Sequence, residues 1–384
     1  MDDAAQPLLQ ALAAGGLERR GHGLFPVPLP LHLPAHGRGR GLAPGLRQLL
    51  RRPPGSWDLP ELPAIGGPLE AEGAVAESQR RCAALLAADH CWFGVHGASG
   101  LLQAALLALV PPGGRVLLPR NLHRSLLHGC VLAGLEPVLF TPPFDPTSGL
   151  WLPAEAAHLQ AVLAAAPPLQ AAVLVDPTYH GRRAMLPPLV ALLHAAGLPV
   201  LVDQAHGRGE ALAAGADLVV LSLQKAAGGL AQSAALLAQG SRVCVERIER
   251  ALLWLGTSSP SALLLASSAS ALAAAHSHNG QRRRAAAEAR GLRLQRHLIQ
   301  QGLPLLPATD PLRLVLLTAP LGIRGLEADA WLLEQRVVAE LPEPGALTFV
   351  LGEHPPPGLR WRLGSALLAL RTALGAAPLP PFSP

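Results

Sequence analysis

Between residues 70 and 238, short apolar segments alternate with longer segments in which apolar residues recur three and four positions apart. The short segments have the length of buried strands, and the longer ones have the spacing of helices that pack one face against a core. Strands that alternate with helices at this rhythm predict an α/β fold, with a mostly parallel sheet covered by helices on both faces. The expected strands are residues 91–95, 115–118, 137–140, 171–175, 199–202, 218–221 and 233–238. The expected helices are residues 73–88, 99–109, 123–133, 153–165 and 187–196.

Two segments of different character flank this alternation. Residues 1–66 are rich in proline and glycine, apart from a short helix expected over residues 5–14, so we expect them to wrap over another surface. Beyond residue 280 an arginine-rich helix precedes further elements, which predicts a smaller α+β unit. The predicted organisation is a wrapping segment, a large domain at 67–280 and a small domain at 281–384. The elements expected in the small domain are strands at residues 312–317 and 347–351 and a helix at 326–335.

Composition argues against several classes of protein. Half of the residues are hydrophobic and 15% are charged, but no uninterrupted apolar run reaches the roughly 18 residues of a membrane span. The chain starts with acidic residues and no basic n-region, so no secretory signal is expected. Four widely spaced cysteines predict neither a disulfide framework nor a metal site and favour a cytoplasmic location. The net charge of +5 comes from scattered arginine clusters without interleaved aromatic residues, so nucleic-acid binding is not expected.

Lys225 is the only lysine in the chain, since arginine occupies every other basic position. Arginine can replace lysine wherever a solvated positive charge is enough, but its guanidinium stays protonated and cannot act as a nucleophile. Lys225 stands just beyond the strand expected at 218–221 and is followed by small residues. Taken alone, this lysine is equally well explained as a chance survivor in a composition that disfavours lysine.

A second feature is the turn His-Gly-Ala-Ser-Gly at residues 96–100, between an expected strand and an expected helix. Small residues with free backbone N–H groups at a helix N-terminus form an anion site suited to phosphate. Ala98, Ser99 and Gly100 are therefore candidate phosphate ligands. The turn matches neither a dinucleotide-binding fingerprint nor a nucleophile elbow, and an ordinary glycine-containing turn is the alternative.

Acidic and aromatic side chains accompany these two features. Asp203 ends the strand expected at 199–202, where a carboxylate can keep a pyridinium nitrogen protonated and His206 can brace it; a helix-capping aspartate is the alternative. His123 follows another strand, where an imidazole can stack on a cofactor ring, and Tyr179 is the only tyrosine. Open α/β sheets bind ligands beyond the carboxyl ends of their strands, so these groups should face one crevice. A lysine amine, an acid for a ring nitrogen and a phosphate cup are the set that pyridoxal 5'-phosphate needs.

In these motifs the chain resembles the major domain of the bacterial ornithine/lysine/arginine decarboxylases, pyridoxal phosphate enzymes with the fold of aspartate aminotransferase (fold type I). The densest matches, in the family's order and spacing, are GAVAE at 73–77, GASG at 97–100, NLHRS at 121–125, DPTYHG at 176–181, DQAHG at 203–207 and SLQK at 222–225. Looser matches are LPAHGRG at 33–39, TSSP at 257–260 and ELPEPGALT at 340–348.

The resemblance implies a role for each candidate residue. Lys225 would bind the cofactor covalently, Asp203 would pair with the pyridinium nitrogen, and His123 would stack on the ring. The phosphate would be held by Ala98, Ser99, Gly100 and Ser222, with Thr257 or Ser258 reaching across from a partner subunit. A homodimer is therefore expected, because active sites in this fold lie at the dimer interface.

The reaction that the resemblance implies removes the α-carboxylate of arginine, lysine or ornithine as CO2. A proton would return to the α-carbon from Lys225 or His206. Selection of a basic substrate needs an acid in the pocket, because an unpaired buried cation costs several kcal/mol. Glu61 is the first candidate for this acid and Glu70 the second, and Tyr179 is a further candidate substrate contact.

The chain departs from the family's pattern at several positions. Gln204 and Gln224 stand where Glu and His are usual, and the N-terminal family motif Pro-Gly-His-Lys has lost its glycine and lysine. Two alternatives follow. One is an aminotransferase that uses Arg360 and Arg362 as a clamp on the carboxylate, and the other is a homologue that binds the cofactor but has lost catalysis.

Overall fold

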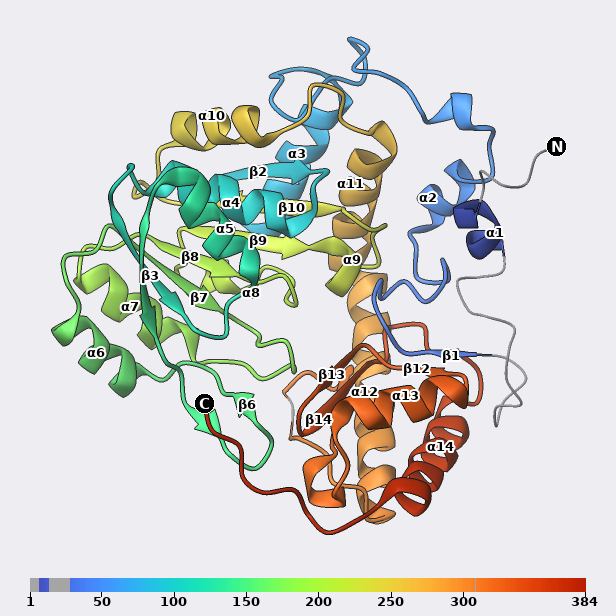
Figure 1. The fold of residues 1–384 in the computed structure, drawn as a ribbon. Coiled ribbons are helices and arrows are strands. Elements are labelled where there is room, and N and C mark those ends of the chain that lie inside the picture. The colour runs from blue at the N-terminus through green and yellow to red at the C-terminus, as the bar shows by residue number, and fades with distance from the viewer. Residues whose placement is uncertain (1–6, 14–27, 308) are drawn as a thin grey trace.

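The computed structural model describes residues 7–13, 28–307 and 309–384. Within these residues a seven-stranded sheet forms the centre of the molecule, in the order β2-β10-β9-β8-β7-β3-β4 (Figure 1). β10 runs antiparallel to both of its neighbours, and the other neighbouring pairs are parallel. The predicted α/β class is therefore confirmed. The strands are β2 (His90–Gly94), β3 (Arg115–Pro119), β4 (Glu136–Phe140), β7 (Ala171–Val175), β8 (Val200–Asp203), β9 (Leu218–Ser222) and β10 (Ala234–Ala238).

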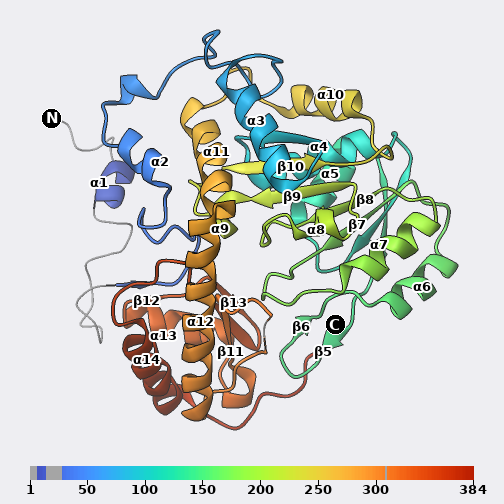
Figure 2. The ribbon, with the colours of Figure 1, turned by 180° about the vertical axis from the view of Figure 1, so that it is seen from behind.

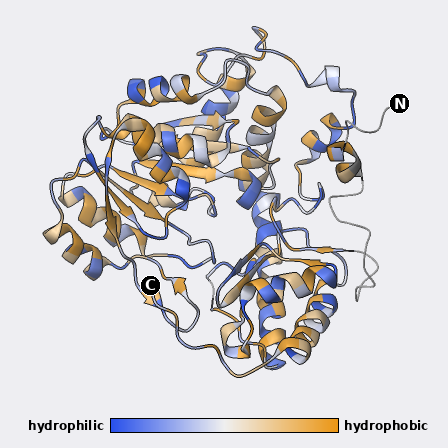
Figure 3. Ribbon diagram, viewed as in Figure 1, coloured by the Kyte–Doolittle hydropathy of each residue, from blue (hydrophilic) through white to orange (hydrophobic). Residues whose placement is uncertain are grey.

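Helices cover both faces of this sheet, because its central strands are apolar on both sides and need a core on each (Figure 3). One face packs against α3 (Gly73–Leu86), α6 (Ala156–Ala165), α7 (Leu186–Ala195) and α11 (Ala262–His276). The other face packs against α4 (Gly97–Leu109), α5 (Arg124–Ala133) and α10 (Val245–Leu255). Two short helices, α8 (Glu210–Ala213) and α9 (Leu223–Ala226), follow β8 and β9.

A smaller antiparallel sheet lies beside the large one, in the order β11-β14-β13. The long helix α12 leads from the large sheet into this unit and packs against its sheet (Figure 2). The elements of this unit are α12 (His278–Gln300), β11 (Arg313–Leu317), α13 (Gly325–Glu334), β12 (Val337–Val338), β13 (Leu341–Glu343), β14 (Ala346–Val350) and α14 (Leu359–Leu374). The predicted boundary near residue 280 stays a prediction, and α12 crosses it.

The N-terminal segment joins both units. Its strand β1 (Leu29–Pro30) pairs in parallel with β12, and Leu29 and Leu31 are fully buried in the core of the smaller unit. Further on, the N–H of Ala35 donates to the carbonyl of Gln224 (2.8 Å), beside the candidate lysine. This part of the chain therefore reaches the edge of the predicted site. The segment also contains α1 (Pro7–Ala13), α2 (Pro44–Leu49) and a 3₁₀ turn at Pro54–Ser56; both ends of the helix expected at 5–14 lie outside the described residues.

Some elements differ from the sequence-based prediction. The helix expected from residue 153 begins at Ala156, and α10 was not predicted. A small hairpin of β5 (Phe144–Asp145) and β6 (Leu150–Trp151) lies between β4 and α6, where no element was predicted. In the described part of the chain, every helix is too short or too polar to span a bilayer.

Candidate active site

A cleft of about 600 Å³ opens at the carboxyl ends of the parallel strands. Val175, Asp203 and Ser222 end β7, β8 and β9, and all three line it. Neighbouring parallel strands end at one edge of a sheet, which is why residues far apart in the sequence meet here. Of the residues predicted for the site, the cleft brings together Ala98, Ser99, His123, Tyr179, Asp203, His206, Ser222 and Lys225.

The N-terminus of α4 forms one wall of the cleft. The N–H groups of Ala98 and Ser99 belong to the first turn of this helix, where no acceptor exists within the helix itself, and Gly100 follows them. Gly97 enters the turn at a φ of +69°, which favours glycine, and its N–H donates to the carbonyl of Gln232 (3.0 Å). The helix dipole adds partial positive charge at this end, so the turn can hold an anion such as a phosphate.

Asp203 lies at the floor of the cleft and is buried. One of its carboxylate oxygens accepts a hydrogen bond from the N–H of Ala205 (3.1 Å). Burial raises the pKa of Asp203, while the Ala205 N–H and the charge of Lys225 oppose that rise. A buried carboxylate with one nearby cation is suited to bind a second positive group, such as a protonated ring nitrogen.

Lys225 reaches the cleft from α9, directly after β9. Its Nζ lies 3.2 Å from Nε2 of His206, and the Nδ1 of His206 lies 2.8 Å from Nη2 of Arg313. Burial lowers the pKa of Lys225; the charge of Asp203 opposes this, and the charge of Arg313 adds to it. A lysine with a lowered pKa is easier to obtain as a neutral amine, the form that acts as a nucleophile.

His123 caps α5 with its own side chain. Its Nδ1 accepts from the N–H of Ser125 (3.2 Å) and lies 2.8 Å from the Ser125 hydroxyl, which fixes the ring at the mouth of the cleft. Burial lowers the pKa of His123, and the charge of Lys225 lowers it further. The ring is therefore neutral near pH 7 and suited to stack on an aromatic group.

Two acids from the smaller sheet approach the cleft, and sequence reasoning did not assign either to the site. Glu340 accepts from the hydroxyl of Tyr179 and from the N–H of Leu33 (2.7 Å), so it joins three segments of the chain. Glu343 lines the cleft and contacts Nε2 of His180. Both acids fall within the 340–348 motif of the resemblance, which was the signal that could have found them.

Glu61, Thr257 and Ser258 lie elsewhere within this chain. They line a neighbouring cavity of about 350 Å³, together with Gly100 and Glu70. His96 and Gly97 contribute to both cavities, so the turn before α4 separates the two. The structure therefore does not bring the predicted acid Glu61 into the same cleft as Lys225.

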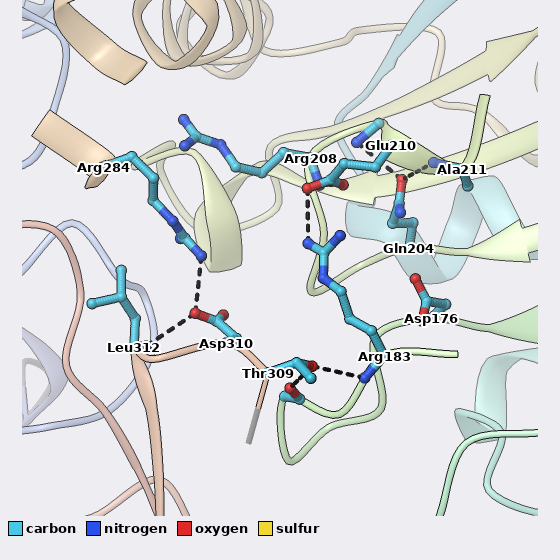
Figure 4. A network of polar contacts seen from close by, with 12 residues as sticks. Asp176, Arg183, Gln204, Arg208, Glu210, Ala211, Arg284, Thr309, Asp310 and Leu312 are labelled. Carbon is cyan, nitrogen blue, oxygen red and sulfur yellow. Dashed lines mark hydrogen bonds and ion pairs between the residues drawn. The ribbon is translucent and has the colours of Figure 1, made fainter. Parts of the chain in front are cut away.

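A polar network holds the smaller sheet against the loops around the cleft (Figure 4). The guanidinium of Arg183 pairs with Glu210 (2.8 Å), and its backbone N–H donates to Thr309 (2.9 Å). Arg284 of α12 pairs with Asp310 (2.9 Å), just before β11. These contacts fix how β11 and its first residue, Arg313, sit against the loops after β7 and β8.

Gln204 has a structural role in the same region (Figure 4). Its side-chain oxygen accepts from the N–H groups of Gly209 and Ala211 (2.9 and 3.2 Å), and the side chain is fully buried. An amide therefore shapes the loop after Asp203 at the position where the family usually has a carboxylate. Gln204 faces this loop, and the walls of the cleft are formed by other residues.

The residues present fit pyridoxal 5'-phosphate. The first turn of α4 offers open N–H groups for a phosphate, and a Cβ at Gly100 would lie only 2.9 Å from the Cβ of His96, so the turn requires glycine to stay compact. Asp203 offers a buried carboxylate for a ring nitrogen, and Lys225 offers a partly buried amine for covalent attachment. The donor set therefore matches the phosphate, the ring nitrogen and the aldehyde of this cofactor.

The fold and the cleft define the class: an α/β protein of the fold type I shared by pyridoxal phosphate enzymes. A family model of the Orn/Lys/Arg decarboxylase major domain matches residues 52–308. The chain belongs to this family.

Relatives with known names are similar over most of the chain. An arginine decarboxylase of Halalkalibacterium halodurans is 32% identical over 326 residues, which cover 80% of this chain and 66% of that protein. An arginine decarboxylase of Bacillus cereus is 30% identical over 80% of this chain and 71% of its own length. The chain thus spans about two thirds of the length of the relatives it matches.

Solved structures share the fold at lower sequence identity. Lysine decarboxylase A from Pseudomonas aeruginosa superimposes with a TM-score of 0.73 at 19% identity, covering 95% of this chain and 59% of that one. Serine palmitoyltransferase from Sphingomonas wittichii gives a TM-score of 0.71 at 17% identity, covering 97% and 98%. A related structure of serine palmitoyltransferase contains pyridoxal phosphate. Family and fold together imply this cofactor.

Proposed function

We propose that this chain is a decarboxylase that uses pyridoxal 5'-phosphate to remove the α-carboxylate of arginine, lysine or ornithine. The observation that carries the proposal is the position of the only lysine: its amine lies within 3.2 Å of His206, in one cleft with Asp203 and the N-terminus of α4. Each of these groups matches one part of the cofactor. The arginine decarboxylases among the relatives support the choice of reaction and substrate class.

In this proposal the residues of the cleft bind particular groups of the cofactor. When bound, pyridoxal phosphate supplies a protonated ring that takes up the electron pair left on the α-carbon as CO2 departs. The Asp203 carboxylate holds the proton on the ring nitrogen, and the first turn of α4, from Ala98 to Gly100, holds the phosphate through its free N–H groups. Ser222, at the end of β9, adds a hydroxyl on the same side of the cleft.

Proton return to the α-carbon falls to Lys225 or His206. Their nitrogen atoms lie 3.2 Å apart, so a proton can move between Nζ and Nε2 without large side-chain motion. His206 is partly buried, which limits exchange of that proton with water.

Borohydride reduction after incubation with pyridoxal phosphate tests cofactor attachment. We expect the protein to gain visible absorption and, after reduction, to carry the cofactor on the peptide that contains Lys225. Peptide mapping by mass spectrometry measures this directly, and the single lysine leaves one side-chain amine in the chain. If Lys225→Ala acquires the same colour and the same label, the assignment of this residue is wrong.

Glu343 is the acid that we propose for the distal cation of the substrate. Glu343 and Asp203 are the acids that line the cleft in the described part of the chain, and Asp203 is assigned to the cofactor. Glu343 is also partly exposed, so its carboxylate can meet an entering cation. Glu61, the acid predicted from the sequence, would need to act through the neighbouring cavity, for instance across a dimer interface.

Matched variants distinguish these two acids. Glu343→Gln should raise KM for the basic substrate roughly tenfold to a hundredfold, because a hydrogen bond to a charged group contributes about 1.5 to 3 kcal/mol. Glu61→Gln serves as the comparison and should change KM by less than about threefold. Steady-state kinetics with both variants measures the difference. If Glu61→Gln raises KM more than Glu343→Gln does, Glu61 is the acid that binds the distal cation.

A homodimer is part of the same proposal. Leu253 and Trp254 on α10 are 66% and 65% exposed, and Leu253 lines the cavity that contains Thr257 and Ser258. A partner that covers this apolar surface would bring Thr257 or Ser258 near the phosphate site of the other subunit. Light scattering should give twice the mass of the chain, and a fully active monomer would refute this part.

We also propose a cytoplasmic location, which is supported by four cysteines that are all free.

The aminotransferase alternative gains no support from Arg360 and Arg362. Both residues lie on α14, and Arg360 contacts His297 (3.2 Å). The cleft is lined by other residues.

A further inference from the structure

We infer that Arg313 is a positioning residue that fixes the tautomer of His206 and thereby holds the amine of Lys225 in its neutral form. The inference rests on the proposed function for its meaning, because a lysine that bonds a cofactor needs its lone pair. The contacts that support the inference are present whatever reaction the chain catalyses. Arg313, His206 and Lys225 form a continuous chain of contacts from the smaller sheet into the cleft.

One ring nitrogen of His206 carries a proton, and the contact with Arg313 determines which one. A guanidinium has only donors, so the 2.8 Å contact from Nη2 of Arg313 requires Nδ1 of His206 to be the acceptor. A neutral imidazole carries one N–H, which must therefore lie on Nε2. Burial lowers the pKa of His206 well below its ordinary value, and an ammonium form of Lys225 and the charge of Arg313 would each lower it further, so the ring is neutral.

The proton on His206 in turn determines the form in which Lys225 makes a favourable contact. Nε2 of His206 faces Nζ of Lys225 at 3.2 Å. An Nε2–H group and an ammonium are both donors and form no hydrogen bond with each other. The contact is favourable only when Lys225 is a neutral amine whose lone pair accepts the Nε2–H.

The charged groups around Lys225 act in both directions. Asp203 and Glu340 favour the ammonium, whereas burial and the charge of Arg313 favour the neutral amine. Glu340 accepts from Tyr179 and from the N–H of Leu33, and the Tyr179 ring lies 5.6 Å from Nζ. His123 faces the same cleft and is neutral. Among these groups, Arg313 is the one that both adds positive charge and sets the donor on His206.

Backbone hydrogen bonds and one ion pair hold the segment that contains Arg313. The carbonyl of Gly181 accepts from the N–H groups of Thr309 and Asp310 (3.0 and 2.9 Å), and the N–H of Arg313 donates to the carbonyl of Asp310 (3.0 Å). Arg284 fixes the Asp310 side chain from α12 (2.9 Å; Figure 4). These contacts hold the backbone of Arg313 in place, and its Nη2 lies 2.8 Å from Nδ1 of His206.

Gly181 makes room for this arrangement. A Cβ at Gly181 would lie 2.8 Å from the Cβ of Arg313, so only glycine allows β11 to pass this close. Arg313 belongs to the smaller sheet, and His206 lies in the turn that follows β8 of the larger one. The neutral amine therefore depends on the packing of one sheet against the loops of the other.

The test uses the full chain freed of cofactor, with lysine labelled at Cε with ¹³C and histidine labelled with ¹⁵N. Because Lys225 is the only lysine, it gives the only lysine signal from the chain. We expect the Cε signal to titrate below the ordinary lysine pKa, and the His206 ring to show the Nε2–H tautomer. His206→Asn identifies the His206 signals.

Two substitutions separate the effects. Arg313→Met removes both the charge and the donor, and it should raise the Lys225 pKa by on the order of one unit and populate the Nδ1–H tautomer. Arg313→Gln removes the charge but keeps a donor, so it should raise the pKa while retaining the tautomer. Circular dichroism checks that each variant is folded; Arg313→Leu replaces Arg313→Met, and Arg313→Asn replaces Arg313→Gln, if either is not.

Defined results would overturn the inference. A wild-type His206 with its proton on Nδ1, or a Lys225 pKa and a His206 tautomer that both stay unchanged in folded Arg313→Met, would leave Arg313 a merely structural role. Neither measurement depends on catalysis. A protein that fails to decarboxylate any basic amino acid but shows these shifts would refute the proposed function and keep the role of Arg313.

Discussion

Replacing Lys225 with arginine is expected to lower the rate of decarboxylation on the order of a thousandfold or more. The variant places a permanent positive charge at this position and loses an amine that can become neutral, bond the cofactor and return a proton. The measurement is kcat with saturating cofactor, compared with the wild type on the same substrate. Circular dichroism checks that the variant is folded.

Chemical rescue supplies the control for this prediction. Lys225→Ala leaves space in the cleft, so an added small alkylamine should restore part of its rate. Lys225→Arg fills that space and should not respond. A Lys225→Ala variant with the wild-type rate and no added amine would remove Lys225 from the reaction altogether.

Replacing Asp203 with asparagine is expected to lower kcat roughly a hundredfold to several thousandfold. Removing one partner of a buried ion pair costs about 3 to 5 kcal/mol, and each 1.36 kcal/mol is tenfold in rate. An amide cannot hold the proton on the ring nitrogen as a carboxylate does. Asp203→Glu keeps the charge and should lose less activity, which separates charge from shape.

The cofactor-free Asp203→Asn protein should be at least as stable as the wild type at neutral pH. Burial raises the pKa of Asp203, so its ionisation opposes folding as the pH rises through and above the ordinary carboxyl range, and the charge of Lys225 offsets only part of this. Asparagine removes that cost. Urea unfolding at pH 7 measures the free energy difference. A large loss of stability without a loss of kcat would indicate a structural role for Asp203.

Sequence reasoning succeeded where the signal is local. Apolar runs such as 171–175 and 218–221 predict strands directly, and their alternation with helices predicts the parallel sheet that the structure contains. Periodicity does not give strand direction, so the antiparallel placement of β10 did not follow from it. The two-residue strands β1 and β12 are too short for any periodic signal and form only because distant segments meet.

The same distinction applies to the candidate site. Residues that end strands of one sheet, such as Asp203 and Ser222, could be placed together because topology alone brings strand ends to one edge. Arg313 and Glu343 come from the smaller sheet, and their approach depends on how the two sheets pack. The sequence contains no comparable rule for that packing. The placement of Glu61 in the site failed for the same reason. Its segment was expected to wrap over another surface, but the sequence does not show which surface the segment covers.

The most direct test of the central proposal measures CO2 released from arginine, lysine and ornithine, each labelled with ¹⁴C at the carboxyl carbon and offered separately. A parallel reaction contains a keto acid as an amino-group acceptor. The proposed function predicts labelled CO2 and an equal amount of the corresponding amine from at least one substrate, with no amino group transferred to the keto acid. Transfer of the amino group without release of labelled CO2 from any of the three would contradict it.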